Sequence, residues 1–163
     1  MNAWHAGSMT EASARDSYRY VDLTKIGDAR YKATNRRGGV LPIGEGDDPD
    51  FTPVELLLAA IAGCTAIDVE YITRKRAVAD SFSVHAEGDK VRDENGNHMT
   101  NLRLVFDITF PDGEAGDAAR ANLPDAIAKS RDRICTVSRT VALGSPVAME
   151  QGSVVEQGAP ATE

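Results

Sequence analysis

The stretch at residues 52–68 constrains the fold most, because it is an almost unbroken run of apolar side chains (TPVELLLAAIAGCTAID). Thr52 is a good N-cap, Pro53 suits the first helical position, and Glu55 can close a capping box with Thr52. A helix that is apolar on every side is buried rather than amphipathic. The run is shorter than the roughly 20 apolar residues that a membrane span requires. We therefore expect the core helix of a soluble domain, ending near Ala77.

The size and charge of the chain exclude several classes of protein. Its 163 residues suffice for one domain with a real core but not for two comfortable ones. The net charge is −7 and Lys and Arg form no block, which argues against nucleic-acid binding. The first residues lack the basic start and apolar core of a signal peptide, and we expect no membrane segment. These features favour a cytoplasmic protein, and two cysteines in that compartment are not a disulfide scaffold.

The rest of the chain predicts a mixture of strands and helices. Alternating apolar residues and turn signals indicate a β-meander before the core helix, two strands after it, a helical region and a last strand. Within the helical region, Pro124 either kinks the helix or opens a new one. The predicted strands cover residues 18–26, 30–34, 40–43, 81–87, 102–110 and 146–155, and the predicted helical region covers residues 116–140. This order is an α+β pattern. We expect a single domain at residues 15–156, with disordered segments at residues 1–14 and 157–163.

Cys64 and Cys135 are the candidate reactive residues. The thiolate is the reactive form of cysteine, so each of them requires a cationic or hydrogen-bonding partner in order to react. Without such a partner, each is simply a small buried residue. Their wide separation in the sequence excludes a CxxC redox motif and any zinc-ligand spacing. The three histidines (His5, His85 and His98) fall in a predicted tail, strand and loop, so none is placed to serve as a base for either thiol.

Two short motifs resemble those of a known family. The sequence PVELLLAAIAGC at residues 53–64 resembles the first cysteine motif of the OsmC/Ohr family, the osmotically inducible and organic hydroperoxide resistance proteins. The sequence CTVS at residues 135–138 resembles the second cysteine motif, which is usually Cys-Pro-Val-Ser. The order of elements also agrees with this family, so the resemblance covers roughly residues 18–155. The two motifs together are specific, whereas either one alone is weak.

The resemblance implies a fold, an assembly and a set of site residues. The implied fold has antiparallel sheets wrapped around a long central helix, in an intertwined homodimer with two active sites at the subunit interface. Cys64 corresponds to the peroxidatic cysteine and Cys135 to the resolving one. The family also uses an arginine from the N-terminal strands, for which Arg30 is nearest in position and Arg36 and Arg37 are alternatives. No metal or organic cofactor is implied.

The chain departs from the family pattern at two positions. The classical peroxidases have a glutamate directly after the motif proline, where this chain has Val54, and Glu55 comes one position later. A shift of one residue turns a side chain by about 100° around a helix. Glu55 is therefore a candidate for either a helix cap or the family's Arg–Glu pair. Thr136 in place of the family's proline is a milder change. The chain is more similar to the divergent OsmC-like branches than to the classical hydroperoxide reductases.

The function implied by the resemblance is a thiol-dependent peroxidase that reduces organic hydroperoxides in oxidative stress defence. Cys64 would attack the peroxide, Cys135 would condense with the resulting sulfenic acid, and an external dithiol would reduce the disulfide. Arg30 would lower the pKa of Cys64 and orient the peroxide. The alternatives are a non-catalytic OsmC-like protein that binds a small molecule and a thiol redox sensor. We predict that the two cysteines are neighbours in space, because a disulfide requires Cα atoms within about 7 Å.

Overall fold

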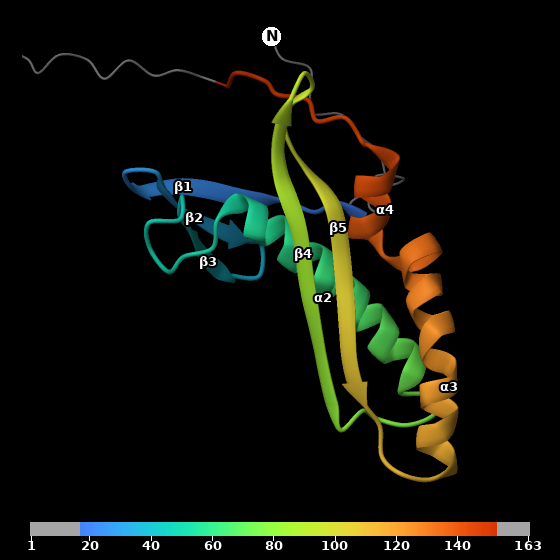
Figure 1. Ribbon diagram of the computed structural model, residues 1–163. Helices are drawn as coiled ribbons and strands as arrows, with labels where there is room; N and C mark the ends of the chain where they lie inside the picture. Colours follow the sequence, from blue (N-terminus) through green and yellow to red (C-terminus); the bar gives the residue numbers. More distant parts are fainter. Residues whose placement is uncertain (1–16, 153–163) are drawn as a thin grey trace, which may run out of the picture. The chain divides into compact units, whose positions relative to one another are not determined.

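The computed structural model describes residues 17–152, and their contacts group into two compact units. The first unit contains the chain up to Ala62 together with His85–Val105, and the second contains Gly63–Val84 and the chain from Phe106 onward. Helix α2 (Pro53–Thr73) and the hairpin of β4 (Ser81–Asp93) and β5 (Gly96–Thr109), labelled in Figure 1, contribute residues to both units. The predicted disordered segments at residues 1–14 and 157–163 lie outside the described residues.

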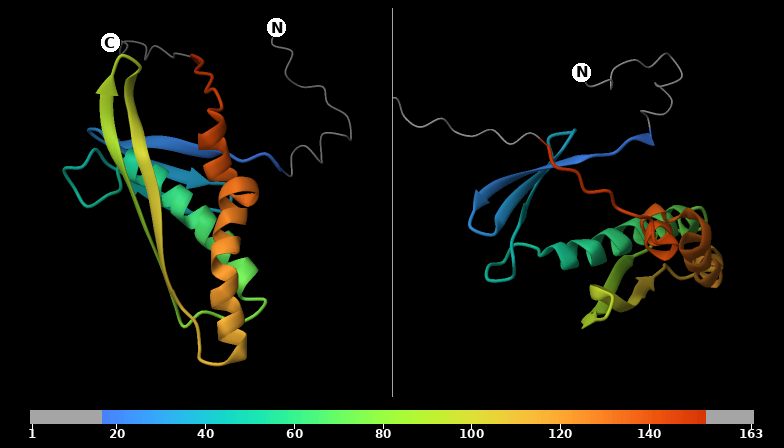
Figure 2. Two further views of the ribbon diagram at one scale, coloured as in Figure 1. Left: turned by 45° about the vertical axis from the view of Figure 1, so that its right-hand side comes forward. Right: turned by 90° about the horizontal axis from the view of Figure 1, so that it is seen from above.

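Three short strands form the predicted β-meander in the first unit. They are β1 (Val21–Gly27), β2 (Arg30–Asn35) and β3 (Val40–Ile43), joined antiparallel in the order β1-β2-β3. The register places Leu23 opposite Ala33, and Ala33 opposite Leu41. Because directly opposed residues point to the same face of a sheet, these apolar side chains share one face. Figure 2 shows the same sheet from two further directions.

Helix α2 (Pro53–Thr73) begins where the sequence predicts, and its N-terminus is closed by the expected capping box. The main-chain N–H of Thr52 donates to Glu55 Oε2 at 2.8 Å, and the main-chain N–H of Glu55 donates to Thr52 Oγ1 at 3.3 Å. The Thr52 hydroxyl also donates to the Glu55 carboxylate, at 2.9 Å. These bonds satisfy amides that the first turn of a helix leaves unpaired. The helix ends at Thr73, slightly before the predicted end at Ala77.

The prediction that α2 is buried on every face is wrong for this chain. Its buried side chains form a single stripe, with one residue per turn: Ile61, Thr65, Val69 and Thr73. On the other faces, Ile67 is 58% exposed and Tyr71 is 55% exposed. Within residues 17–152, α2 is the one helix long and apolar enough, by length and composition alone, to cross a membrane. The apolar run in the sequence is shorter than α2 because it ends at Asp68, whereas the helix continues to Thr73.

Strands β4 (Ser81–Asp93) and β5 (Gly96–Thr109) form a two-stranded sheet that is longer than predicted. The two arrows run in opposite directions in Figure 1, so the pair is an antiparallel hairpin. Its turn contains the expected Asn-Gly signal, with Gly96 at φ 91°, a conformation that glycine adopts readily. Polar residues of both strands extend the pairing; for example, Arg103 Nε donates to Glu87 Oε1 at 2.6 Å. The sequence predicts shorter strands because the prediction relies on alternating apolar residues, which the polar ends of these strands near the turn lack.

The helical region of the second unit has three parts instead of one helix with a proline break. They are α3 (Glu114–Lys129), the π-helical turn η1 (Ser130–Ile134) and α4 (Thr136–Leu143). Pro124 lies inside α3 and does not begin a new helix. The break comes at Cys135, which has an extended backbone (φ −64°, ψ 104°). The predicted last strand is also wrong over residues 146–152, which form no strand, and residues 153–155 lie outside the described residues.

Most of the fully buried side chains belong to the second unit. Its buried residues are Thr65, Val69, Thr73, Phe110, Gly116, Ala119, Ala126, Ser130 and Cys135. In the same unit Phe82 and Phe106 meet edge to face, with ring centroids 6.5 Å apart. Ser130 begins the turn η1 and Cys135 follows it, and because both are completely buried they anchor this part of the chain in the core beside the cysteine site.

Candidate active site

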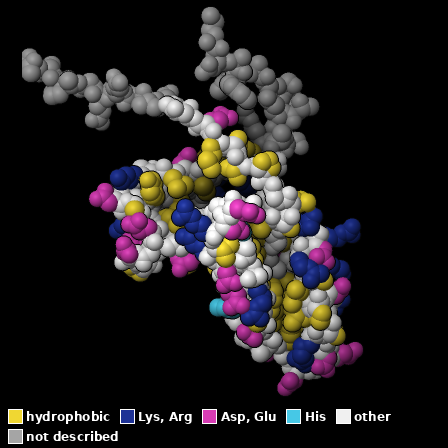
Figure 3. Space-filling view, turned by 45° about the horizontal axis from the view of Figure 1, so that its top comes forward, with side chains coloured by type: hydrophobic (Ala, Val, Ile, Leu, Met, Phe, Trp, Pro, Cys, Tyr) yellow, Lys and Arg dark blue, Asp and Glu magenta, His cyan; other side chains and the backbone are white. Residues whose placement is uncertain are grey.

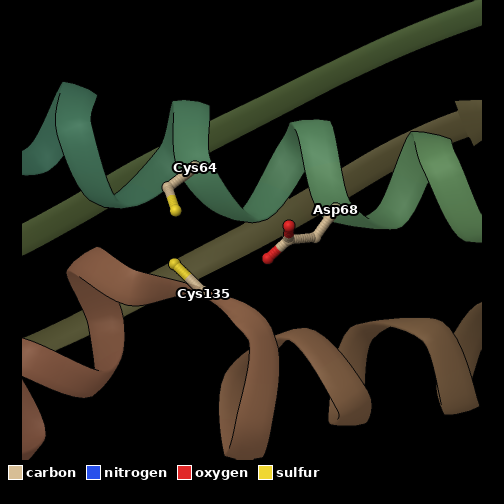
Figure 4. A group of neighbouring side chains, drawn as sticks. All are labelled: Cys64, Asp68 and Cys135. Carbon is tan, nitrogen blue, oxygen red and sulfur yellow. The ribbon is translucent and has the colours of Figure 1, made fainter. Parts of the chain in front are cut away.

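Cys64 and Cys135 lie close together in the second unit, as predicted. Cys64 is in the middle of α2, Cys135 precedes α4, and their sulfurs point toward one another (Figure 4). The two Sγ atoms and a carboxylate oxygen of Asp68 all lie within 4.8 Å of one another. Both cysteines are free thiols. The prediction that these distant positions meet in space is therefore confirmed.

Cys135 caps a helix, whereas the sequence placed it inside one. The π-helical turn η1 ends at Ile134, and Cys135 then acts as the N-cap of α4. Its sulfur accepts a hydrogen bond from the main-chain N–H of Ser138 at 3.3 Å and lies 3.2 Å from Ser138 Oγ. The hydroxyl of Thr65, on α2, donates to the same sulfur at 3.5 Å. π-helical turns occur frequently at functional sites, and here the turn positions a thiol at a helix start.

The first turn of α4 serves both sulfurs. The main chain of Val137 forms a hydrogen bond to Cys64, and that of Ser138 forms one to Cys135. Such amides, together with the positive end of the helix dipole, favour a thiolate over a thiol. Thr136 is the first helical residue, a position where proline is common. A proline there, as in the family motif, would keep this geometry, which explains why the change to threonine is mild.

The two thiols differ in acidity. Burial raises the pKa of Cys64, the hydrogen bond from Val137 opposes this, and the neighbouring Cys135 and Asp68 raise the pKa further, so that the net shift is upward. Burial alone would also raise the pKa of Cys135, but hydrogen bonds from Ser138, Thr65 and Cys64 outweigh burial and lower the pKa overall. This result is opposite to the expected lowering of the Cys64 pKa by an arginine.

Asp68 is a site residue that the sequence analysis missed. It lies one turn after Cys64 on the same helix, and its Oδ2 accepts a hydrogen bond of 2.9 Å from the hydroxyl of Ser130. The four-residue spacing between a cysteine and a carboxylate on a predicted helix was the available signal, because such residues share one face. The negative charge of Asp68 disfavours a thiolate at Cys64.

The predicted arginine belongs to the other unit. Arg30 begins strand β2, as expected, and its guanidinium pairs with two carboxylates of the loop before α2: Asp48, with Nε to Oδ2 at 2.8 Å, and Asp50. The hydrogen bond to Asp50 and the charges of both aspartates raise the pKa of Arg30. The alternatives, Arg36 and Arg37, lie in the turn between β2 and β3. The role of Arg30 beside Cys64 stays a prediction.

Glu55 acts as the helix cap that its position indicated. Its carboxylate accepts hydrogen bonds from both the main chain and the hydroxyl of Thr52, and these bonds lower the pKa of Glu55. Glu55 also belongs to the first unit, whereas the cysteines belong to the second. Any further role in an Arg–Glu pair stays a prediction.

An open, shallow depression of about 260 Å³ lies elsewhere on the second unit. It is lined by Ala66, Ile67, Glu70, Val78, Ala79 and Phe82. Neither cysteine contributes to it. This depression is therefore lined by residues other than the two cysteines.

The chain is therefore an α+β protein in which two cysteines, one within α2 and one at the start of α4, lie side by side. Residues 44–150 match the family of OsmC-like proteins. This match covers more than half of the chain, and the chain therefore belongs to the OsmC-like family.

Several known proteins are similar to this chain in sequence or in fold. A protein of Mycobacterium tuberculosis that is described as uncharacterised is 29% identical over 140 residues, covering 84% of this chain and 96% of that protein. The solved OsmC-like protein of unknown function from Vibrio cholerae has a TM-score of 0.65 at 15% identity, covering 76% of this chain and 93% of that one. A hypothetical protein from Aquifex aeolicus has a TM-score of 0.64 at 21% identity, covering 79% and 90%. These structures establish the fold shared with this chain.

Proposed function

We propose that this chain is a thiol-dependent peroxidase that reduces organic hydroperoxides. In the first step the Cys64 thiolate attacks the peroxide ROOH, the O–O bond breaks, and Cys64 sulfenic acid and an alcohol form after protonation. In the second step the Cys135 sulfur attacks the sulfenic acid, forming the disulfide and releasing water. An external dithiol then reduces the disulfide and is itself oxidised, which restores both thiols.

The observation that carries this proposal is the placement of both sulfurs within 4.8 Å at the first turn of α4. The N–H groups of this turn stabilise whichever sulfur is ionised. Cys64 is partly exposed and can meet a substrate, whereas Cys135 is completely buried and is suited to attack an oxidised neighbour. Free thiols at the end of each cycle fit a cytoplasmic location, where cysteines are kept reduced.

Among the described residues, the groups whose charge influences the pKa of Cys64 are Cys135 and Asp68, and both raise it. The reaction therefore also requires a positive charge near Cys64. We assign this role to Arg30 in the assembled homodimer. Arg30 would then exchange part of its pairing with Asp48 and Asp50 for the thiolate. A guanidinium suits this position because it stays charged and offers several donors to a thiolate and a peroxide oxygen.

A homodimer is proposed because the chain leaves large apolar side chains uncovered. Those on α2 include Ile67 and Tyr71. Apart from the adjacent residues and the backbone of α2 itself, no atom of the described residues lies within 4 Å of the position where Gly63 would carry a Cβ. Figure 3 shows apolar side chains gathered at the surface of the face that it presents. Obligate interfaces commonly bury more than about 2,000 Å² and are apolar, so a second copy is the natural cover. Sedimentation at micromolar concentration should give a dimer, and a monomer would contradict this assembly.

Peroxide consumption tests the proposed activity. Purified protein, tert-butyl hydroperoxide and a dithiol reductant should show multiple turnovers, and Cys64→Ser should show none. Cys135→Ser is the matched control: in the absence of the dithiol it should consume about one equivalent of peroxide and retain a sulfenic acid that a dimedone probe labels. Equal consumption by wild type and Cys64→Ser would reject the mechanism.

A thiol redox sensor is the second candidate, because the raised pKa of Cys64 slows its reaction with peroxide. A sensor would form the Cys64–Cys135 disulfide once and would not turn over with a small dithiol. The same assay separates the two functions, since a sensor consumes a single equivalent of peroxide per chain.

A further inference from the structure

Three potential metal ligands converge at the cysteine site. The sulfurs of Cys64 and Cys135 and the carboxylate of Asp68 point into the same space between α2 and the start of α4 (Figure 4). We propose that, in the reduced protein, these three side chains bind a thiophilic divalent cation such as Zn²⁺. This inference does not depend on the proposed peroxidase activity.

The spacing of the donors suits such an ion. The three ligand atoms lie within 4.8 Å of one another. Tetrahedral zinc has Zn–S bonds of about 2.3 Å and Zn–O bonds of about 2.1 Å, which place neighbouring ligand atoms about 3.6–3.8 Å apart. A movement of about 1 Å or less, within the range of a side-chain adjustment, would bring the three atoms to that distance. Two thiolates and one carboxylate are also a donor set that zinc accepts.

The charges at the site favour a cation. If both thiols ionise, the two sulfurs and the carboxylate together carry three negative charges. Among the ion pairs of residues 17–152, none includes Asp68. A divalent ion would compensate most of this charge, and binding is balanced by the release of one proton from each thiol.

Neighbouring groups already hold two of the ligands in place. The hydroxyl of Ser130 donates to Asp68 Oδ2 at 2.9 Å, which orients the carboxylate and leaves its other oxygen for a metal. The main-chain N–H of Ser138 donates to the sulfur of Cys135 at 3.3 Å. Hydrogen bonds of this kind, made by groups around the ligands, orient metal ligands and tune their affinity.

The site would have three protein ligands and one open position. Cys64 is partly exposed, so an ion can enter from its side and keep a water molecule as the fourth ligand. A disulfide between Cys64 and Cys135 would remove both thiolate ligands. Metal binding and disulfide formation therefore exclude one another, and the site is present in the reduced state alone. The sequence argument against zinc applies to ligands close in sequence, whereas the fold brings these ligands together from distant positions.

Cd²⁺ and Zn²⁺ titrations of the full-length reduced protein test this site. Chelator-treated protein, kept free of oxygen, should bind one Cd²⁺ per chain with the ultraviolet charge-transfer absorption of two thiolate–cadmium bonds. Zn²⁺ should displace the Cd²⁺. Cys64→Ser and Cys135→Ser should each lose more than about 100-fold in affinity, and Asp68→Asn should lose about 10- to 100-fold while keeping the absorption per bound ion.

Matched controls make the result decisive. Asp107→Asn, which removes an exposed carboxylate from β5 of the same unit, should leave the affinity unchanged. Asp68→Asn retains an oxygen that accepts the Ser130 hydrogen bond, and Asp68→Ala takes its place if the asparagine variant fails to fold. Protein oxidised to the disulfide should bind neither ion at this site. Unchanged affinity in either Asp68 variant, or equal binding by oxidised and reduced protein, would overturn the proposal. If either of these results is obtained while peroxide turnover persists, the metal site alone is rejected and the proposed peroxidase activity stands.

Discussion

Cys64 and Cys135 face one another, yet their surroundings act on their acidity in opposite directions. Cys135 is completely buried, but Ser138 and Thr65 supply enough hydrogen bonds to lower its pKa. Cys64 is more exposed, but burial of its sulfur and the nearby carboxylate of Asp68 raise its pKa. Burial raises the pKa of both thiols, so the hydrogen-bond donors and charges around each sulfur decide which one ionises more readily. In the isolated chain, the buried thiol is the more acidic one.

Replacing either cysteine should have its largest effect on the free energy of unfolding, and the two positions should differ. Cys135→Ala removes a buried sulfur and the N-cap of α4, and should lower the free energy of unfolding by about 2 kcal/mol. Cys64→Ala, at the partly exposed position, should lower it by less than about 1 kcal/mol. Urea unfolding of both variants in reducing buffer measures the difference. Equal losses would show that the bonds to Cys135 do not stabilise the fold.

Arg30 is expected to stabilise the thiolate of Cys64 and to leave Cys135 unaffected. In a Cys135→Ser background, so that one thiol remains, Arg30→Met should slow alkylation of Cys64 near neutral pH several-fold, because the thiolate loses its cation. Iodoacetamide labelling followed by mass spectrometry gives the rates. Arg37→Met is the matched control, and should alkylate at the parent rate. A slow Arg37 variant beside an unchanged Arg30 variant would transfer the role to Arg37.

Asp68 should act in the opposite direction. Burial is the largest cause of the raised Cys64 pKa, and the Asp68 charge adds to it. In the same single-thiol background, Asp68→Asn should therefore lower the Cys64 pKa and speed its alkylation at neutral pH modestly, up to a few-fold. Rates measured across a pH series should show the midpoint displaced to lower pH. Asp107→Asn serves as the control, and an unchanged midpoint for Asp68→Asn would remove this carboxylate from the account.

Glu55 provides the smallest effect and a pH test of the first unit. Its pKa is lowered in the folded protein, so its stabilising contribution is fully present above the ordinary glutamate pKa and is lost as pH falls through the lowered value. Glu55→Gln should therefore be slightly less stable than wild type at neutral pH, and the difference should shrink in acid. Thermal unfolding at several pH values measures this. A difference that grows in acid would contradict the capping role of the Glu55 carboxylate.

The sequence predicted those parts of the fold that depend on local signals. The capping box of Thr52 and Glu55 starts α2 where expected, and the turn signals locate the three strands of the meander. The resemblance of two motifs also brought Cys64 and Cys135 together correctly. These features are encoded by neighbouring residues or by a recognisable motif, so they are readable before the structure.

The parts that could not be predicted depend on tertiary contacts. The exposed faces of α2 reflect what one chain alone can cover, which hydrophobicity does not report. The break at Cys135 depends on a π-helical turn and on hydrogen bonds to Ser138 and Thr65. The acidity of the two thiols depends on the same donors and on Asp68. Apart from the four-residue spacing of Cys64 and Asp68, these contacts leave no pattern of periodicity along the sequence.

The most direct test of the central claim is to treat the reduced protein with one equivalent of tert-butyl hydroperoxide and no reductant, and then to analyse it under denaturing, thiol-blocking conditions by mass spectrometry. The account predicts a disulfide within each chain between Cys64 and Cys135, with a mass lower by two hydrogens and one alcohol formed per peroxide. Two free thiols after complete peroxide exposure, or disulfides solely between chains, would contradict it.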